Sequence, residues 1–128
     1  MEKRVFFISG HRDITEAEFN KYYRTALFRA IDNYDAYFVV GDYYGVDIMA
    51  QNYLVNVLKI NPEHITVYHM FEKPRNLNSK ITNLKGGYKD DIERDSAMTN
   101  ESDEDIAFIR KGKEASGTAQ NILRRYTF

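Results

Sequence analysis

The segment FFISGHRDIT, Phe6–Thr15, decides the fold of this chain. Its apolar part ends at Ser9-Gly10, and two basic side chains, His11 and Arg12, follow immediately. An apolar run that stops at a glycine is typical of a buried strand leading into a tight turn. Two interpretations of the basic pair remain open: it decorates a solvated turn, or it lies beside an anionic ligand at the end of the strand.

Four short runs of β-branched and aromatic residues predict strands. Their apolar character is nearly continuous rather than alternating, which is typical of parallel strands covered on both faces. The predicted strands are Arg4–Ser9, Ala36–Val40, His64–His69 and Asp105–Ile109.

Helical patterns alternate with these strands. A capping-box signature begins the first helix, and Asn61-Pro62 stops the second. The expected helices run from Thr15 to about Ile31, from Val46 to Leu58, over about Lys89–Glu101, and from Gly117 to the end of the chain. This alternation predicts an α/β fold. We expect a single Rossmann-like domain over residues 1–128, with a mainly parallel sheet of about four or five strands and helices on both faces.

Residues 70–88 do not follow this alternation. They contain Pro74, Gly86 and Gly87 and show no convincing hydrophobic period. Loops of this length in a compact domain are usually functional or disordered.

Composition narrows the class of protein. The chain has 128 residues, a formal net charge of −1 and no cysteine. The absence of cysteine excludes disulfides, thiolate zinc sites and cysteine nucleophiles, and it fits the cytoplasm, where we expect the protein. No run is long enough for a membrane span, and no metal-ligand spacing or cofactor motif stands out, so we predict no membrane partner, metal or cofactor. The near-neutral charge argues against nucleic acid as a partner.

Ligands of open parallel sheets bind beyond the carboxyl ends of the strands. Glycines allow close approach of the backbone, while helix N-termini and arginine side chains favour phosphate. The predicted ligand-binding residues are Ser9, Gly10, His11 and Arg12 after the first strand, Gly41 and Gly45 after the second, Arg75 in the long loop, and Ser116, Gly117, Thr118 and Asn121 at the last helix.

Each of these motifs also has a purely structural interpretation. Ser116 and Thr118 are suited to capping a helix as well as to binding phosphate. Asp42 and Asp47 either flank the second helix or accept hydrogen bonds from a ribose. Tyr43 and Tyr44 either stack on a base or cover the end of that helix.

Arg94 lies four residues before Met98 on the third predicted helix, so both side chains share one helix face. If Met98 belongs to the core, Arg94 lies at its edge, where a solvated charge is less expected. Either a functional role or snorkelling of the side chain explains this position.

Several motifs together resemble the SLOG superfamily. They are GHRDIT, VVGDYYGVDIMAQNYL, ERDSAMTNESDEDIAFIR and SGTAQNILRR, and they cover most of the chain outside residues 70–88. This Rossmann-like group includes the Lonely Guy phosphoribohydrolases, the DNA-processing protein DprA and YpsA-type proteins. The chain is most similar to the small YspA-like members, many of them bacterial or phage proteins. The resemblance implies a pocket for a nucleotide-derived ligand and a homo-oligomer.

In Lonely Guy enzymes, an arginine four residues before a methionine and a PGGxGTxxE motif form the phosphoribohydrolase site. Arg94 and Met98 match the first element, and the segment Ser116–Thr118 matches the end of the second. Asn121 stands at the position of the catalytic glutamate, and an amide cannot ionise as a general base. The acids that would have to replace the glutamate are Asp42, Asp47 and Asp95.

Three functions are therefore considered. The first is a sensor or binding protein for a nucleotide-like small molecule, and the alternative is a hydrolase of the N-glycosidic bond of a nucleoside monophosphate. Nucleic-acid binding ranks last because of the charge. For the expected oligomer, the apolar and aromatic face from Phe19 to Tyr23 is the predicted contact surface.

Overall fold

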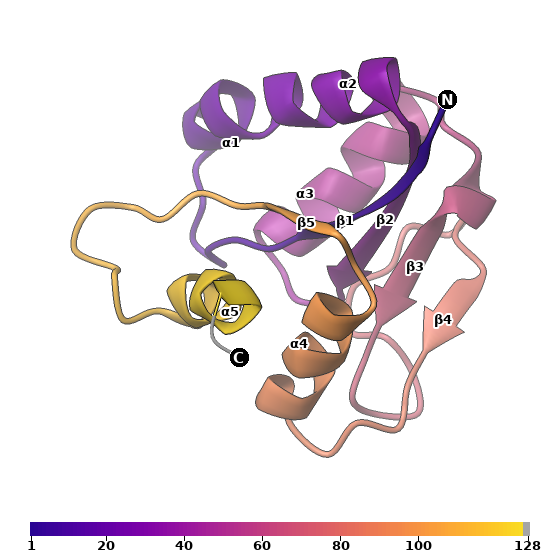
Figure 1. Cartoon of the computed structure of the whole chain (residues 1–128). Helices are drawn as coiled ribbons and strands as arrows, with labels where there is room; N and C mark the ends of the chain where they lie inside the picture. The colour runs from indigo at the N-terminus through magenta and orange to yellow at the C-terminus, as the bar shows by residue number, and fades with distance from the viewer. Residues whose placement is uncertain (127–128) are drawn as a thin grey trace.

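A five-stranded parallel sheet forms the centre of the molecule. The computed structural model describes residues 1–126. Every neighbouring pair of strands is parallel, and the order across the sheet is β4-β3-β2-β1-β5. The predicted α/β Rossmann-like architecture is confirmed. The strands are β1 (Lys3–Ile8), β2 (Asp35–Gly41), β3 (Ile65–Tyr68), β4 (Asn83–Lys85) and β5 (Glu104–Ile106) (Figure 1).

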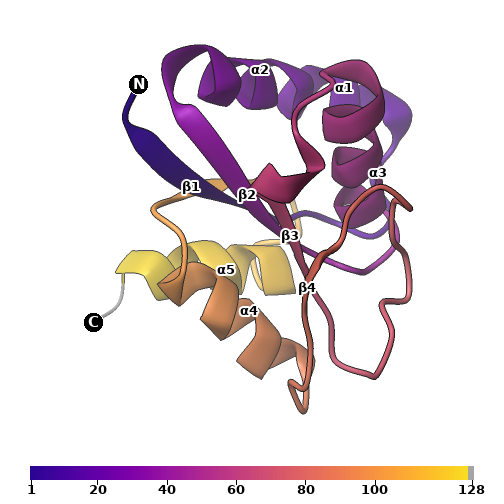
Figure 2. The same ribbon diagram turned by 90° about the vertical axis from the view of Figure 1, so that its right-hand side faces the viewer.

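Helices cover both faces of the sheet. Figure 2 shows α1, α2 and α3 on one face and α4 and α5 on the other. In residues 1–126, no helix has the length and apolar character needed to cross a membrane. The helices are α1 (Glu16–Tyr22), α2 (Arg24–Asn33), α3 (Val46–Asn52), α4 (Asp91–Asn100) and α5 (Gly117–Tyr126), and a π-helical turn, Tyr53–Val57, continues α3.

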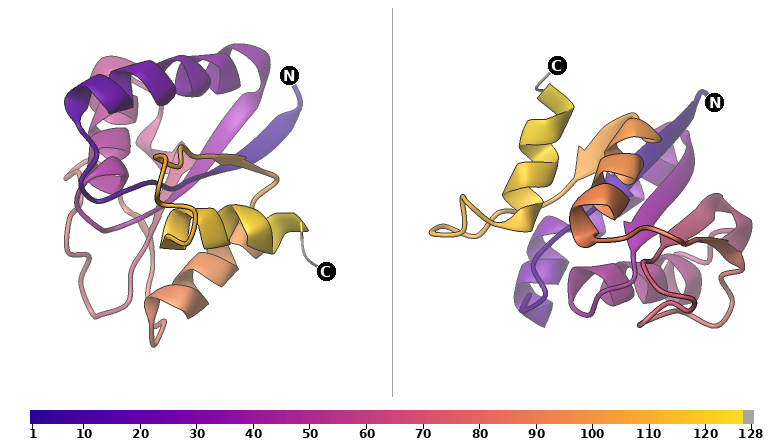
Figure 3. Two further views of the ribbon diagram at one scale, coloured as in Figure 1. Left: turned by 90° about the vertical axis from the view of Figure 1, so that its left-hand side faces the viewer. Right: turned by 90° about the horizontal axis from the view of Figure 1, so that it is seen from below.

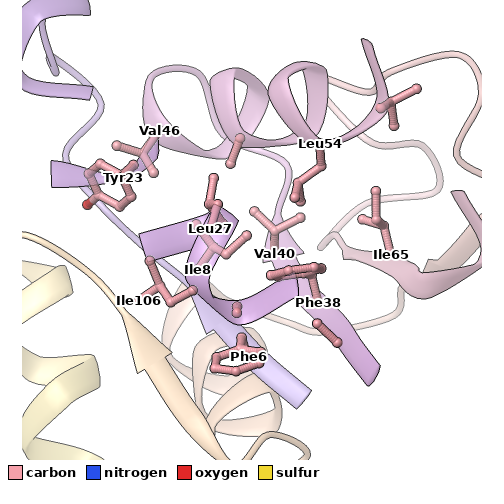
Figure 4. Close-up of a cluster of buried hydrophobic side chains, with 14 of the residues drawn as sticks. Phe6, Ile8, Tyr23, Leu27, Phe38, Val40, Val46, Leu54, Ile65 and Ile106 are labelled. Atoms are coloured by element: carbon pink, nitrogen blue, oxygen red, sulfur yellow. The ribbon is translucent and has the colours of Figure 1, made fainter. Parts of the chain in front are cut away.

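The alternation of side chains along β1 connects the two layers of helices. Phe6 and Ile8 pack with Leu27 in the larger core cluster, under α1, α2 and α3 (Figure 4). Phe7 points to the other face and packs with Met98 of α4. Each large apolar side chain buried in this way stabilises the fold by about 1.5–3 kcal/mol. The carboxyl end of β1 is therefore held from both sides.

The first predicted helix is interrupted at Tyr23, where the sequence pattern indicated one continuous helix. Tyr23 has a φ of −111°, and α1 ends before it while α2 begins after it. Its fully buried side chain donates a hydrogen bond to the carbonyl of Ser9 and accepts one from the amide of Phe108. Phe19 stacks on the Tyr23 ring at 5.4 Å between centroids. Because both rings lie in the core, the interpretation of Phe19 and Tyr23 as a dimer surface is wrong.

Residues 70–88 contain a strand that the sequence did not indicate. β4 pairs in parallel with β3 at the edge of the sheet. Its three residues are all exposed, so no buried apolar pattern announces the strand. The preceding loop is fixed rather than loose, since Gln51 hydrogen bonds to Asn76 and Asn78 within it.

Candidate ligand-binding site

A polar cavity lies beyond the carboxyl ends of β1 and β2. Its volume is about 400 Å³, which is within the range of small-molecule sites. The walls come from the segments after β1 and β2, from α4 and from the first turn of α5. The predicted site residues that line it are Ser9, Gly10, His11, Arg12, Gly41, Asp47, Arg94, Asp95, Ser116, Gly117, Thr118 and Asn121, whereas Asp42, Gly45 and Arg75 do not.

One part of the wall presents hydrogen-bond donors that have no acceptor within residues 1–126. Ser9 is 5% exposed, and its Oγ has no hydrogen-bond partner in residues 1–126. Ser9 follows Phe7 by two residues, so chain alternation directs its side chain toward the α4 side of the sheet, where the cavity lies. The amides of Gly117 and Thr118 begin α5 and have no acceptor among the described residues. We call Ser9, Gly117 and Thr118 the donor wall.

Ser116 has the structural role that its position suggested. Its Oγ accepts a hydrogen bond from the amide of Ala119 at 3.2 Å, which caps α5. The positive end of the helix dipole and the two free amides of the donor wall therefore remain available to a ligand at the start of α5.

Two cationic side chains, Arg12 and Lys113, lie at the edge of the cavity. Neither forms an ion pair within residues 1–126. Arg110, from the same loop as Lys113, is bound instead to Asp13 at 3.0 Å and to Glu18 at 2.8 Å. This loop, residues 107–116, projects from the body of the molecule between β5 and α5 (Figure 3). Arg110 therefore anchors the loop that carries Lys113.

His11 lines the cavity as a neutral imidazole. Its Nε2 accepts a hydrogen bond of 2.9 Å from the amide of Arg110, which leaves the proton on Nδ1. Burial, and then the charge of Arg110, lower the pKa of His11. Of the basic pair that follows β1, only Arg12 is therefore a cation at neutral pH.

Arg94 is enclosed by carboxylates. Its Nη1 donates to Asp42 at 3.0 Å and lies 3.4 Å from Asp91, while Nε and Nη2 both donate to Oδ1 of Asp95. The side chain is only 7% exposed. Charged side chains are buried when they are paired in this way. The position of Arg94 at the edge of the core is thus explained by ion pairs.

Asp42 anchors the long loop and does not line the cavity. It is fully buried, and its two carboxylate oxygens accept hydrogen bonds from the Arg75 side chain at 2.8 and 3.1 Å. The amide of Arg75 donates to the same carboxylate, and Asn76 donates twice to the Asp42 carbonyl. Asp42 and Arg75, both predicted from the sequence as site residues, therefore hold Arg94 and the loop in place.

Asp47 lies in the first turn of α3 and is 8% exposed. Its Oδ2 accepts a hydrogen bond from the amide of Tyr43 at 3.1 Å, and Oδ1 has no hydrogen-bond partner among the described residues. Burial raises the pKa of Asp47 to about 7, although the Arg94 charge opposes this shift. A carboxyl group with such a pKa can donate or accept a proton near neutral pH.

Asn121 joins α5 to α4 at the cavity. Its Nδ2 donates to Oδ2 of Asp95 at 3.2 Å, and its Oδ1 accepts from Arg124 at 2.7 Å. Burial raises the pKa of Asp95, and the neighbouring Arg94 opposes that shift. Asn121 itself carries no carboxylate, but it holds the carboxylate of Asp95 beside it in the cavity wall.

Two glycines allow the segments to approach each other. Gly45 has a φ of +83°, and a Cβ there would lie 2.5 Å from the backbone of Arg12. A Cβ on Gly10 would overlap the side chains of Tyr23 and Val46. Gly45 packs against the backbone of Arg12, which lines the cavity, and does not itself line it.

Two tyrosines lie at the mouth of the cavity. The rings of Tyr43 and Tyr44 are 4.6 Å apart between centroids, and Tyr44 is 52% exposed. The guanidinium of Arg75 lies over the Tyr43 ring, and Arg12 Nη1 donates to its hydroxyl at 3.4 Å. An aromatic face is thus fixed beside a cation at the rim.

Sequence reasoning missed three charged residues of the wall, Asp13, Asp91 and Lys113. Asp91 stands three residues before Arg94, a helical spacing that places opposite charges side by side and could have identified it. Lys113 carries no such signal because it lies in an irregular loop. In residues 1–126, no group of three or more His, Asp or Glu side chains is arranged to hold a metal ion.

No protein-family model, curated protein or solved structure matches this chain.

Proposed function

We propose that this protein binds a nucleotide, or another small ligand containing phosphate and ribose, as a sensor or binding protein. The observation that carries the proposal is the donor wall, in which a buried hydroxyl and two free amides line one cavity. An unpartnered polar group in the interior is costly, and a phosphate oxygen would satisfy Ser9 Oγ. The start of α5 supplies the dipole and amides that favour an anion.

The rim adds features that suit the rest of such a ligand. Arg12 and Lys113 provide positive charge near the donor wall. Tyr44 offers an exposed ring on which a base can stack, which is worth about 1–3 kcal/mol per base in nucleic-acid complexes. The proposal agrees with the resemblance to the SLOG superfamily, and we include membership of that superfamily in the proposal.

Calorimetric titration with AMP, ADP-ribose, NAD and cyclic AMP tests this function. We expect at least one of these compounds to bind. Ser9→Ala should weaken binding by roughly 10-fold, since a lost hydrogen bond to a charged group costs about 1.5 kcal/mol or more. Because Ser9 Oγ forms no hydrogen bond with any residue that the structure describes, the variant should keep the melting temperature of the native protein.

Thr99 offers a matched control. Its hydroxyl is also buried and has no hydrogen-bond partner in the described part of the chain, but Thr99 does not line the cavity. Thr99→Val should leave the affinity unchanged. Absence of binding across all four compounds, or equal losses in both variants, would contradict the proposal.

A second candidate function is hydrolysis of the N-glycosidic bond of a nucleoside monophosphate, and Asp47 is the observation that favours it. The bond between C1′ and the base breaks, and the base leaves with a proton that Asp47 donates. Water adds its hydroxyl to C1′, and the remaining proton of the water returns to Asp47. Its buried carboxyl, with a pKa of about 7, suits this role. Asp95, held by Asn121, would stabilise positive charge that develops on the sugar.

Chromatographic detection of free base after incubation with AMP, GMP, CMP and UMP tests the second candidate. We expect Asp47→Asn to abolish release, because an amide donates no proton to the leaving base. Release of base by this variant at the native rate would refute the mechanism. Absence of release from the native protein would refute the hydrolase function and leave ligand binding as the proposed function.

A further inference from the structure

The cavity has a second chemically distinct part, formed by Asp47, Asp91 and Asp95, which we call the carboxylate wall. Its charge is not balanced by the arginines beside it. Arg94 and Arg75 together contact three carboxylates, those of Asp42, Asp91 and Asp95, so one negative charge remains before Asp47 is counted. A phosphate placed there would be repelled.

Arg94 itself has little capacity left for a ligand. Its Nε, Nη1 and Nη2 each already contact a carboxylate oxygen at 3.0 or 3.1 Å. Its side chain is 93% buried. The guanidinium therefore orients the carboxylates, and the phosphate belongs to the donor wall.

The carboxylate wall offers hydrogen-bond acceptors, but it has no free cationic group that could bind an anion. Oδ1 of Asp47 accepts no hydrogen bond among the described residues, and Oδ2 of Asp95 accepts one, from Asn121. An ionised carboxylate oxygen can accept more than one hydrogen bond. Neutral hydroxyl groups are the ligand atoms that match such acceptors.

From these contacts we infer that the carboxylate wall is a sugar subsite, in which Asp47 and Asp95 accept hydrogen bonds from the 2′- and 3′-hydroxyls of a ribose. This inference rests on the proposed nucleotide-binding function and adds the orientation of the ligand. The phosphate lies at Ser9 and the first turn of α5, the ribose at Asp47 and Asp95, and the base leaves toward Tyr44. The subsite selects a ribonucleotide over its 2′-deoxy counterpart.

Two matched pairs of probes test this inference by calorimetry on the native protein. The pairs are AMP with 2′-deoxy-AMP, and ribose 5-phosphate with 2-deoxyribose 5-phosphate, so the second pair is independent of the base. We expect the ribose form to bind roughly 10- to 100-fold more tightly in each pair, the range for one hydrogen bond to a charged group.

Asp47→Asn should narrow both ratios to a few-fold, while Ser9→Ala should weaken all four probes and leave both ratios unchanged. Equal affinities within each pair on the native protein would overturn the sugar subsite and leave nucleotide binding intact. Failure of all four probes to bind, together with failure of the compounds tested above, would overturn the nucleotide-binding function and the subsite with it.

Discussion

At the scale of single residues, Asp42 shows how a site residue predicted from the sequence became a structural one. Its carboxylate is fully buried and contacts both Arg75 and Arg94. Burial alone would raise the pKa of Asp42. The hydrogen bonds from Arg75 and the charges of Arg75 and Arg94 together outweigh this effect and lower the pKa. Asp42 therefore fixes Arg94, and through it Asp95, at the cavity.

Removal of this carboxylate should be strongly destabilising. Asp42→Ala removes the carboxylate that accepts hydrogen bonds from both Arg94 and Arg75, and each hydrogen bond between charged groups of this kind is worth about 1.5–3 kcal/mol. Chemical denaturation of the two proteins measures the difference. Glu104→Ala, which removes the exposed pair with Arg4, is the control and should cost less than about 1 kcal/mol. Equal losses in the two variants would argue against Asp42 as an anchor.

Asp47 makes stability depend on pH. Its pKa of about 7 in the folded protein exceeds the ordinary value of 3.8. The folded state therefore holds a proton that the unfolded state releases, and Asp47 destabilises the fold progressively as the pH rises from about 4 to about 7. Asp42, Asp95 and Arg94 are the charged groups that face it.

Asp47→Asn should remove this dependence. The difference in unfolding free energy between the variant and the native protein should increase, in favour of the variant, by more than about 1 kcal/mol from about pH 4 to about pH 8. One pKa unit corresponds to about 1.4 kcal/mol. Denaturation curves at the two pH values measure the gain. An unchanged difference between the proteins would show that Asp47 titrates normally.

At the scale of elements, the pattern of apolar residues predicted most of the structure. The strands and helices that carry buried stripes, such as β1, β2 and α3 together with its π-helical continuation, were predicted within a few residues of their bounds. β4 was missed because its residues are exposed, and the break between α1 and α2 was missed because it depends on Tyr23. The partners of Tyr23, Ser9 and Phe108, are distant in the chain, so no local pattern reveals the break.

The turn between β2 and α3 depends on Gly45. Gly45→Ala would place a Cβ against the Arg12 backbone in a conformation that L-residues avoid, and we expect a loss of at least about 2 kcal/mol. Gly117→Ala is the matched control at the other helix start, because no atom lies within 4 Å of its Cβ position. Melting temperatures of the two variants compare these effects, and equal values would contradict the account of this turn.

At the scale of the whole molecule, the sequence predicted the position of the cavity better than the contacts of the side chains that line it. The rule that ligands bind at the carboxyl ends of parallel strands located the cavity. The roles of its side chains depend on contacts between distant segments: Arg110 with His11, Arg75 with Asp42, and Asn121 with Asp95. A single sequence contains no signal for these pairs, so it could not show that carboxylates enclose Arg94.

We place the phosphate of the ligand at the donor wall, and a crystal structure of the protein with AMP is the decisive test of this claim. We predict the phosphate within hydrogen-bond distance of Ser9 Oγ and of the amides of Gly117 and Thr118, with the ribose toward Asp47. A phosphate bound against Arg94, or AMP bound outside the cavity, would contradict the claim.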